Sequence, residues 1–127
     1  MSGTQEELEA WRFAMDLVES VYRCTQEFAK QEWYGLTNQI RRAAVSVPSK
    51  IAEGKGLSSE RELMQFLDHA RGSLYEFQTQ VKIARRLNYL NIDAASASDS
   101  QTEQAGRLLN GLIRKFRTPP ASPEPKA

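Results

Sequence analysis

Apolar side chains recur at helical spacing over residues 59–88, and this regularity constrains the fold more than any other feature. The positions alternate in steps of three and four: Leu63, Leu67, Ala70, Leu74, Phe77, Val81 and Ala84. Such spacing places one continuous apolar stripe along a helix. Ser59 and Glu62 precede the run and form the S-x-x-E pattern of a helix-capping box. A long amphipathic helix is therefore predicted from 59 to about Asn88, and it must bury its stripe against other elements.

Three further segments show helical periodicity, over residues 6–28, 36–53 and from 98–100 to the prolines Pro119 and Pro120. Pro48 lies inside the second pattern and crowds the carbonyl four residues earlier, so we expect a kink there or two short helices. Gly54 and Gly56 after that segment indicate a helix stop, because glycine adopts the left-handed conformation at little cost. The polar stretch 91–98 is expected to be a loop.

The predicted fold class is all-α, an up-down-up-down antiparallel four-helix bundle in one domain over residues 1–117. The connections between the segments are short, which favours antiparallel neighbours. Residues 118–127 hold four prolines and almost no apolar residues, so a disordered proline-rich tail is expected. The sequence contains no run of about 18 apolar residues, and its polar N-terminal residues lead us to expect no secretory signal. The single cysteine, Cys24, suits a reducing compartment. These features predict a cytoplasmic protein without a membrane partner.

The first segment carries more apolar residues than one packing face needs. Leu8, Trp11, Met15, Val18 and Tyr22 form one stripe, and a second, neighbouring stripe contains Ala14, Leu17, Val21, Cys24 and Phe28. Together they exceed the face of about 100° that a helix needs for one core. We therefore expect this helix to be buried on two sides, with Ala14, Leu17, Val21 and Phe28 at a subunit interface.

Few residues point to catalysis or to a cofactor. His69 is the only histidine, and it is beside the apolar stripe, where a polar packing role is commoner than a catalytic one. The Cys and His residues show no metal-binding spacing, and the Gly54–Gly56 segment lacks both the dinucleotide fingerprint and the phosphate-loop ending. We expect no catalytic residue, no metal and no cofactor, and hence a protein that is not an enzyme.

The net charge is only +1, but an up-down bundle would gather basic residues at both of its ends. Phosphate contacts need such clusters. Bases at helix C-termini also complement the helix dipole without any ligand, and Glu6, Glu7 and Glu9 are expected to offset one cluster. The candidates for contact with nucleic acid or a protein partner are Arg41, Arg42, Lys50, Lys55, Arg71, Arg85 and Arg86. Arg41, Arg42 and Arg71 have an alternative role as interface ion pairs with Glu53 or Glu76.

The sequence resembles the four-helix-bundle proteins encoded in intervening sequences of 23S ribosomal RNA genes. The most specific stretch is the second segment, with Gly35-Leu36-Thr37, Arg41 to Ser49 and Ile51-Ala52-Glu53-Gly54. Trp11 to Tyr22, Ala70 to Glu76 and Leu108 to Ile113 resemble the other helices of the family. Lys50 stands where the family commonly has asparagine.

This resemblance implies a homopentameric ring, as in the related accessory variability proteins of diversity-generating retroelements. Those proteins bind a reverse transcriptase and nucleic acid through basic surfaces. The resulting hypothesis is a non-enzymatic homo-oligomer, a pentamer by resemblance, that contacts RNA, DNA or a reverse-transcriptase-like protein. The alternative is a purely structural oligomer or protein-interaction scaffold without affinity for nucleic acid.

Overall fold

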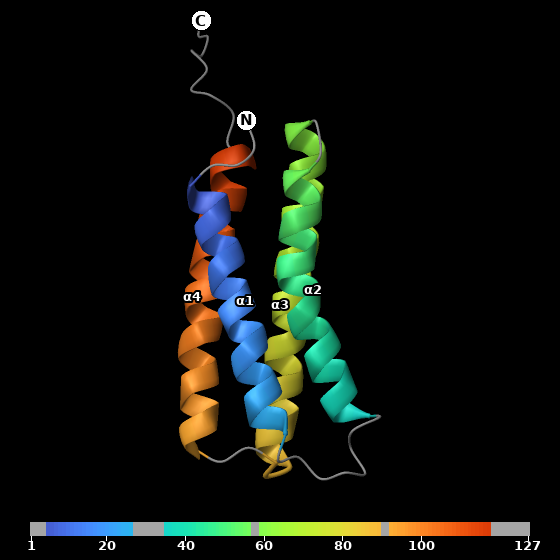
Figure 1. The fold of residues 1–127 in the computed structure, drawn as a ribbon, viewed down its shortest axis with the longest axis vertical. Helices are drawn as coiled ribbons and strands as arrows, with labels where there is room; N and C mark the ends of the chain where they lie inside the picture. The colour runs from blue at the N-terminus through green and yellow to red at the C-terminus, as the bar shows by residue number, and fades with distance from the viewer. Residues whose placement is uncertain (1–4, 27–34, 57–58, 90–91, 118–127) are drawn as a thin grey trace, which may run out of the picture.

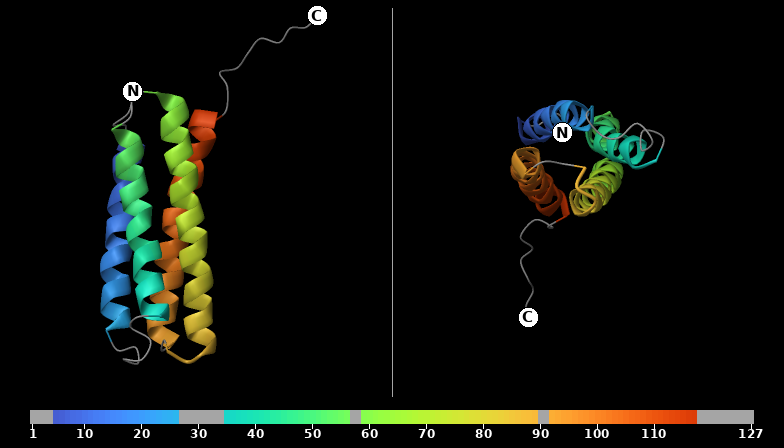
Figure 2. Two further views of the ribbon diagram at one scale, coloured as in Figure 1. Left: turned by 90° about the vertical axis from the view of Figure 1, so that its right-hand side faces the viewer. Right: turned by 90° about the horizontal axis from the view of Figure 1, so that it is seen from below.

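The computed structural model describes residues 5–26, 35–56, 59–89 and 92–117. They form four helices: α1 (Gln5–Thr25), α2 (Leu36–Lys55), α3 (Glu60–Arg86) and α4 (Ile92–Arg117). Each helix packs on the next along the chain, and α4 packs back on α1. Figure 1 shows neighbouring helices running in opposite directions, and the end-on view of Figure 2 places one helix at each corner of the bundle. The predicted all-α up-down-up-down bundle is confirmed.

One apolar core runs through the bundle and receives side chains from all four helices. Every position of the stripe predicted between residues 63 and 84 is buried there. Its largest fully buried side chain is Phe77, and full burial of such a side chain contributes about 1.5–3 kcal/mol. Periodicity along α3 therefore identifies the face that holds the bundle together.

Both ends of α3 are capped by its own sequence. Ser59 is extended at φ −121° and its hydroxyl accepts the backbone N–H of Glu62 at 3.1 Å, as the capping-box pattern predicts. At the other end Asn88 has φ 63°, a left-handed conformation that asparagine tolerates better than most residues. The backbone N–H of Tyr89 then donates to the carbonyl of Ala84 at 2.9 Å, which closes the helix.

Helix α2 is continuous from Leu36 to Lys55 with Pro48 inside it, so the alternative of two short helices is wrong. The kink near Pro48 stays a prediction. The helix stops where expected, but for a different reason: Gly56 caps it at φ −81°, which is not left-handed. Gly54 lies within the last turn and is buried against α3. A Cβ there would lie 3.0 Å from both Leu63 Cδ1 and Phe66 Cβ, so glycine permits the two helices to approach closely.

The fourth helix begins earlier than expected. We expected a loop over residues 91–98, whereas α4 starts at Ile92. The segment after Ile92 contains three alanines, which are the strongest helix formers, but it lacks the large apolar residues that reveal periodicity. Helix α1 ends at Thr25. The expected continuation to Phe28 and the tail 118–127 lie outside the described residues.

Candidate interaction surfaces

The two apolar stripes of α1 have different environments. Ala14, Leu17 and Val21 are inside the core of the single chain, with 0%, 0% and 5% of their surface exposed. A second copy of the chain could not contact these three side chains unless the bundle opened. Phe28, the fourth expected interface residue, lies outside the described ranges. The apolar side chains that α1 offers to a partner are therefore those of its other stripe.

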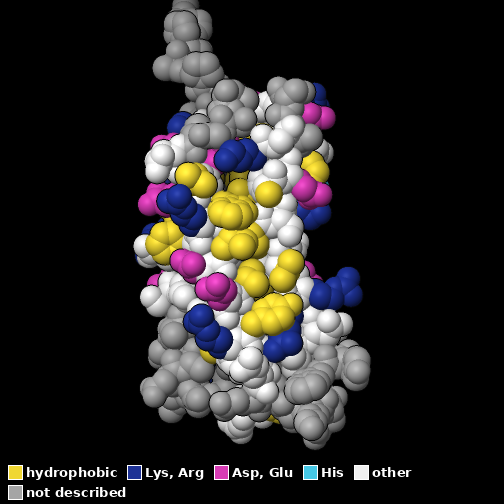
Figure 3. Space-filling view, viewed as in Figure 1, with side chains coloured by type: hydrophobic (Ala, Val, Ile, Leu, Met, Phe, Trp, Pro, Cys, Tyr) yellow, Lys and Arg dark blue, Asp and Glu magenta, His cyan; other side chains and the backbone are white. Residues whose placement is uncertain are grey.

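That other stripe follows the border between α1 and α2, and we call this surface the α1–α2 seam. Met15, Tyr22 and Val45 are 41%, 40% and 39% exposed. Trp11 and Val18 are partly buried and pack on the edge of the core, and Leu8 and Ala52 extend the surface at its upper end. Figure 3 shows apolar side chains gathered in a strip along this border.

A pocket of about 470 Å³ opens at the upper end of the seam. Leu8, Trp11, Ile51 and Ala52 provide its apolar lining, and the buried Glu7 and exposed Lys55 provide its charged groups. An apolar cavity with few polar groups can receive an apolar side chain of a partner. The pocket therefore extends the seam as a surface for binding.

Arg41 lies at the lower end of the seam, where it contacts α1. Its guanidinium lies 4.3 Å from the centre of the Tyr22 ring, and its Nε donates to Thr25 Oγ1 at 2.8 Å. A further bond reaches the carbonyl of Tyr22 at 3.3 Å. A cation at the last carbonyls of a helix is favourable. Arg41 thus joins α2 to the C-terminal end of α1.

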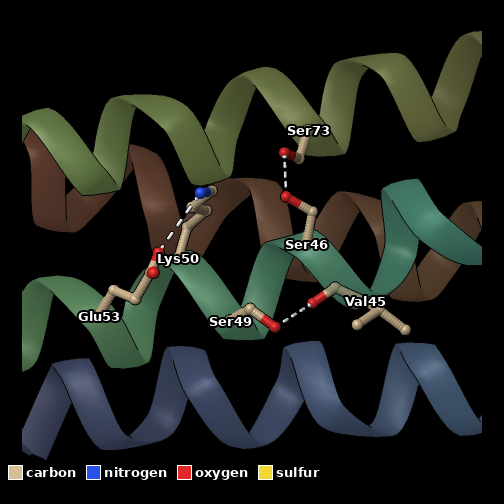
Figure 4. A network of polar contacts seen from close by, with 6 residues as sticks. All are labelled: Val45, Ser46, Ser49, Lys50, Glu53 and Ser73. Carbon is tan, nitrogen blue, oxygen red and sulfur yellow. Dashed lines mark hydrogen bonds and ion pairs between the residues drawn. The ribbon is translucent and has the colours of Figure 1, made fainter.

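Three more of the candidate basic residues have partners inside the chain. Lys50 Nζ lies 3.4 Å from Glu53 Oε1 (Figure 4) and 5.7 Å from the centre of the Phe66 ring. Arg71 bonds Asp68 at 3.2 Å and Asn110 at 3.1 Å. Arg85 makes two bonds of 2.9 Å to the carboxylate of Asp99. Pairs at or near the surface contribute little to stability, but these three bases already have partners for their charged groups.

The remaining three candidates are Arg42, Lys55 and Arg86. Each is exposed, and none of the three side chains forms a hydrogen bond or ion pair with another residue of the described ranges. Arg42 lines a groove between α2 and α3 together with Glu76, but within the described residues no ion pair joins them. The structure therefore does not bring the seven candidates together as one site. Three candidates have side chains without a partner in the described ranges, and the other four already contact neighbouring residues.

The two ends of the bundle carry acids as well as bases. Lys115 of α4 pairs with Glu6 of α1 at 3.3 Å, so an acid of the first turn offsets a base at this end, as the sequence predicted. At the opposite end, Asp99 and Glu103 line a groove between α3 and α4 with Lys82 and Arg85. Neither end is a purely basic surface.

The signature stretch of α2 makes a polar contact with α3. The hydroxyls of Ser46 and Ser73 lie 2.8 Å apart, whereas Ser49 turns back to the carbonyl of Val45 (Figure 4). These serines therefore link helices or satisfy local backbone. Beside them, Val45 contributes its side chain to the seam.

A second apolar surface was missed in the sequence. Tyr75, Ile83 and Leu87 lie on the outside of α3 and are 50%, 43% and 52% exposed. We call this surface the α3 outer patch, and Lys82 and Arg86 border it. In the sequence, these three residues stand at positions i, i+8 and i+12, which places them on the face opposite the core. The pattern is easily overlooked because the core stripe of α3 is much more regular.

The described residues show no arrangement that holds a metal ion. Among them no group of three His, Cys, Asp or Glu side chains is close enough for coordination. His69 is exposed and its ring meets Phe66 edge-on at 5.7 Å, and Cys24 is half-buried. Within the same ranges no helix is long and apolar enough to cross a membrane.

Comparisons with known proteins agree with this architecture. The family model of the 23S rRNA-intervening sequence protein matches residues 6–111. A crystal structure of a protein with unknown function from the S23 ribosomal protein family of Bacteroides thetaiotaomicron superimposes with a TM-score of 0.80. It is 14% identical, and the alignment covers 87% of this chain and 99% of that one. At this identity the likeness concerns the fold. No curated protein matches the sequence.

Proposed function

This chain belongs to the 23S rRNA-intervening sequence protein family, and we propose that it works as a non-enzymatic, homo-oligomeric binding protein. In this proposal, copies of the chain associate through apolar surfaces. The assembled protein then contacts nucleic acid, or a protein that handles nucleic acid, through basic side chains. The ring of five copies that the family resemblance implies is part of the proposal.

The observation that carries the proposal is the exposure of the α1–α2 seam. Three large apolar residues, Met15, Tyr22 and Val45, are each about two-fifths exposed in the single chain. They continue into an apolar pocket walled by Trp11. A contiguous apolar surface of this kind marks an interaction site in a folded protein. It favours a function based on binding over one based on a reaction.

Arg42, Lys55 and Arg86 support the contact with nucleic acid. Each can form a phosphate contact, because no residue of the described ranges occupies it. A single copy offers these charges at separate places, so its affinity would be weak. An oligomer repeats the same charges, and binding through several copies strengthens a weak contact without any new side chain.

A salt-dependent binding measurement tests this part. The full chain would be titrated into labelled single-stranded and double-stranded RNA and DNA, followed by anisotropy at two salt concentrations. Phosphate contacts predict a steep loss of affinity as salt rises. Replacement of Arg42, Lys55 and Arg86 by Gln should weaken binding and flatten the salt dependence.

Arg12, Arg61 and Arg114 provide the matched control. They are also exposed, and their replacement by Gln changes the net charge by the same amount. Equal losses in the two triple variants would show a non-specific charge effect and would contradict the assignment. No binding at low salt would leave the alternative, an oligomer that is structural or binds only proteins.

A further inference from the structure

The pocket at the upper end of the seam has a charged group in an otherwise apolar wall. Leu8, Trp11 and Ile51 line it together with Glu7. Glu7 is only 1% exposed, whereas acidic side chains of folded proteins are almost always at the surface. The volume of about 470 Å³ is within the range of small-molecule sites. Size and lining are thus those of a site for a small molecule.

We propose that this pocket binds an organic cation, that is, a molecule with an aromatic or aliphatic body and one protonated amino group. The apolar body packs against Leu8, Trp11 and Ile51, and the ammonium group reaches the carboxylate of Glu7. All of these residues belong to one chain, so the site requires neither the association of copies nor a contact with nucleic acid. The inference therefore goes beyond the proposed function and is independent of it.

The burial of Glu7 determines the charge of the ligand. A charge acts more strongly on its neighbours in the interior of a protein than in water. A neutral apolar group in the pocket would remove water from the carboxylate without replacing its interactions, at a cost in free energy. An ammonium group donates three hydrogen bonds and compensates for this loss. Because a carboxylate accepts several hydrogen bonds, Glu7 can receive the ligand and keep its contact within the chain.

Trp11 favours the same kind of ligand. An indole attracts a nearby cation more strongly than the ring of tyrosine or phenylalanine does, and it also provides a large apolar contact area. Trp11 is partly buried and packs against the core, so the fold holds it in position before a ligand enters. A molecule that combines an apolar body with a cationic group therefore finds a partner for both parts.

Two bases lie near the mouth of the pocket. Lys55 is part of the lining, and Arg12 follows Trp11 on α1; both side chains are exposed. Water and salt screen such charges, and the flexible stem of lysine allows its ammonium group to turn towards solvent. Glu6, the neighbouring acid, is paired with Lys115. The buried carboxylate of Glu7 is thus the charge that acts most directly on a ligand inside the pocket.

Three probes with the same ring system and different charges test the proposal. Naphthylmethylamine is cationic at neutral pH, naphthylmethanol is neutral and naphthoate is anionic. Calorimetric titration of the full chain should show that the amine binds about tenfold to a hundredfold more tightly than the alcohol, because a hydrogen bond to a charged group adds about that much affinity. Naphthoate should bind most weakly. Equal binding of amine and alcohol, a preference for naphthoate, or no binding of the amine would overturn the proposal.

Glu7→Gln keeps the shape of the side chain and removes its charge. It should lower the affinity for the amine to that for the alcohol and leave the alcohol unchanged. Glu9→Gln is the matched control, because Glu9 is an exposed acid of the same helix that does not line the pocket. This variant should change none of the three affinities. An equal loss of amine binding in both variants would reveal a general effect of charge and contradict the contact with Glu7.

Ala52→Phe locates the site independently of charge. Ala52 is exposed and lines the pocket, so a larger side chain there can fill the pocket without disturbing the core. The variant should bind neither the amine nor the alcohol, while its circular dichroism stays that of the wild type. Unchanged amine binding would place the ligand elsewhere and overturn the assignment. If Glu7→Gln failed to fold, the order of the three probes and the result for Ala52→Phe would still decide.

Discussion

Gly54 offers a quantitative test of how α2 packs against α3. The residue is buried, and a Cβ at this position would lie 3.0 Å from Leu63 Cδ1 and 3.0 Å from Phe66 Cβ. The Leu63 methyl belongs to a side chain that is 1% exposed, so it has little space to move into. The Phe66 Cβ is attached to the backbone of α3. Gly54→Ala therefore requires the two helices to move apart slightly.

Two opposing effects determine the change in the free energy of unfolding. Overpacking in a core costs about 1–3 kcal/mol. Replacing glycine by alanine within a helix gains about 1 kcal/mol. We expect Gly54→Ala to destabilise the protein by a net amount of about 0–2 kcal/mol.

Gly111 of α4 is the matched control, because a Cβ there meets nothing within 4 Å. Gly111→Ala should keep the full helix gain of about 1 kcal/mol. Urea unfolding at one fixed protein concentration would compare the two variants, since oligomerisation makes stability depend on concentration. Gly54→Ala should be less stable than Gly111→Ala by about 1–3 kcal/mol. Equal stabilisation by both substitutions would refute the close approach at Gly54.

Three further substitutions can be measured in the same unfolding assay. Ser73→Ala should cost about 1 kcal/mol because it leaves the part-buried hydroxyl of Ser46 without its partner; the double change to alanine should cost less, and a larger cost would contradict the pairing. Asn110→Ala removes the acceptor of the Arg71 bond and should cost about 1 kcal/mol. Asn110→Asp keeps an acceptor oxygen there and should cost less, so an equal loss in both variants would contradict the contribution of this bond. Asn88→Ala should cost about 1 kcal/mol at its positive φ, while Asn88→Gly should cost nothing.

The core of the bundle could be predicted because its physical cause is periodic. Leu63 to Ala84 repeat at helical spacing and are all buried, and the capping residue Ser59 marks where their helix begins. The start of α4 could not be found in this way. Its first turns are rich in alanine and serine, which permit a helix without marking an apolar face.

Hydrophobicity alone does not show which of the two α1 stripes faces the core, since both stripes are apolar. The residues that face the core include Ala10 and Ala14, whose small side chains allow neighbouring helices to pack closely. Met15 and Tyr22 are bulkier and about two-fifths exposed in the single chain, and Trp11 is partly buried at the edge of the core. The buried stripe also contains Leu17 and Val21, and the other stripe contains Val18. Side-chain size therefore does not separate the two stripes either, and only the packing of the four helices shows which one faces the core.

Some partners of the basic residues depend on details that a sequence pattern does not contain. Arg41 reaches Thr25 and Tyr22 across the α1–α2 contact, and Arg71 reaches Asn110 on α4. Which bases find such partners depends on the relative height of the helices. Lys50 and Arg71 also pair with acids three residues away on their own helices, Glu53 and Asp68, and the sequence contains that spacing. The contacts of Arg41 with α1 and of Arg71 with Asn110 appear only in three dimensions.

The mass of the purified chain in solution shows whether copies of it associate. One chain has a mass of 14.4 kDa, and sedimentation equilibrium or light scattering at micromolar concentration would show how many copies associate. We expect a discrete multiple of this mass that falls towards a single copy in Met15→Glu. A wild-type protein that keeps the mass of one chain at every concentration, with Met15 and Tyr22 exposed to water, would contradict it.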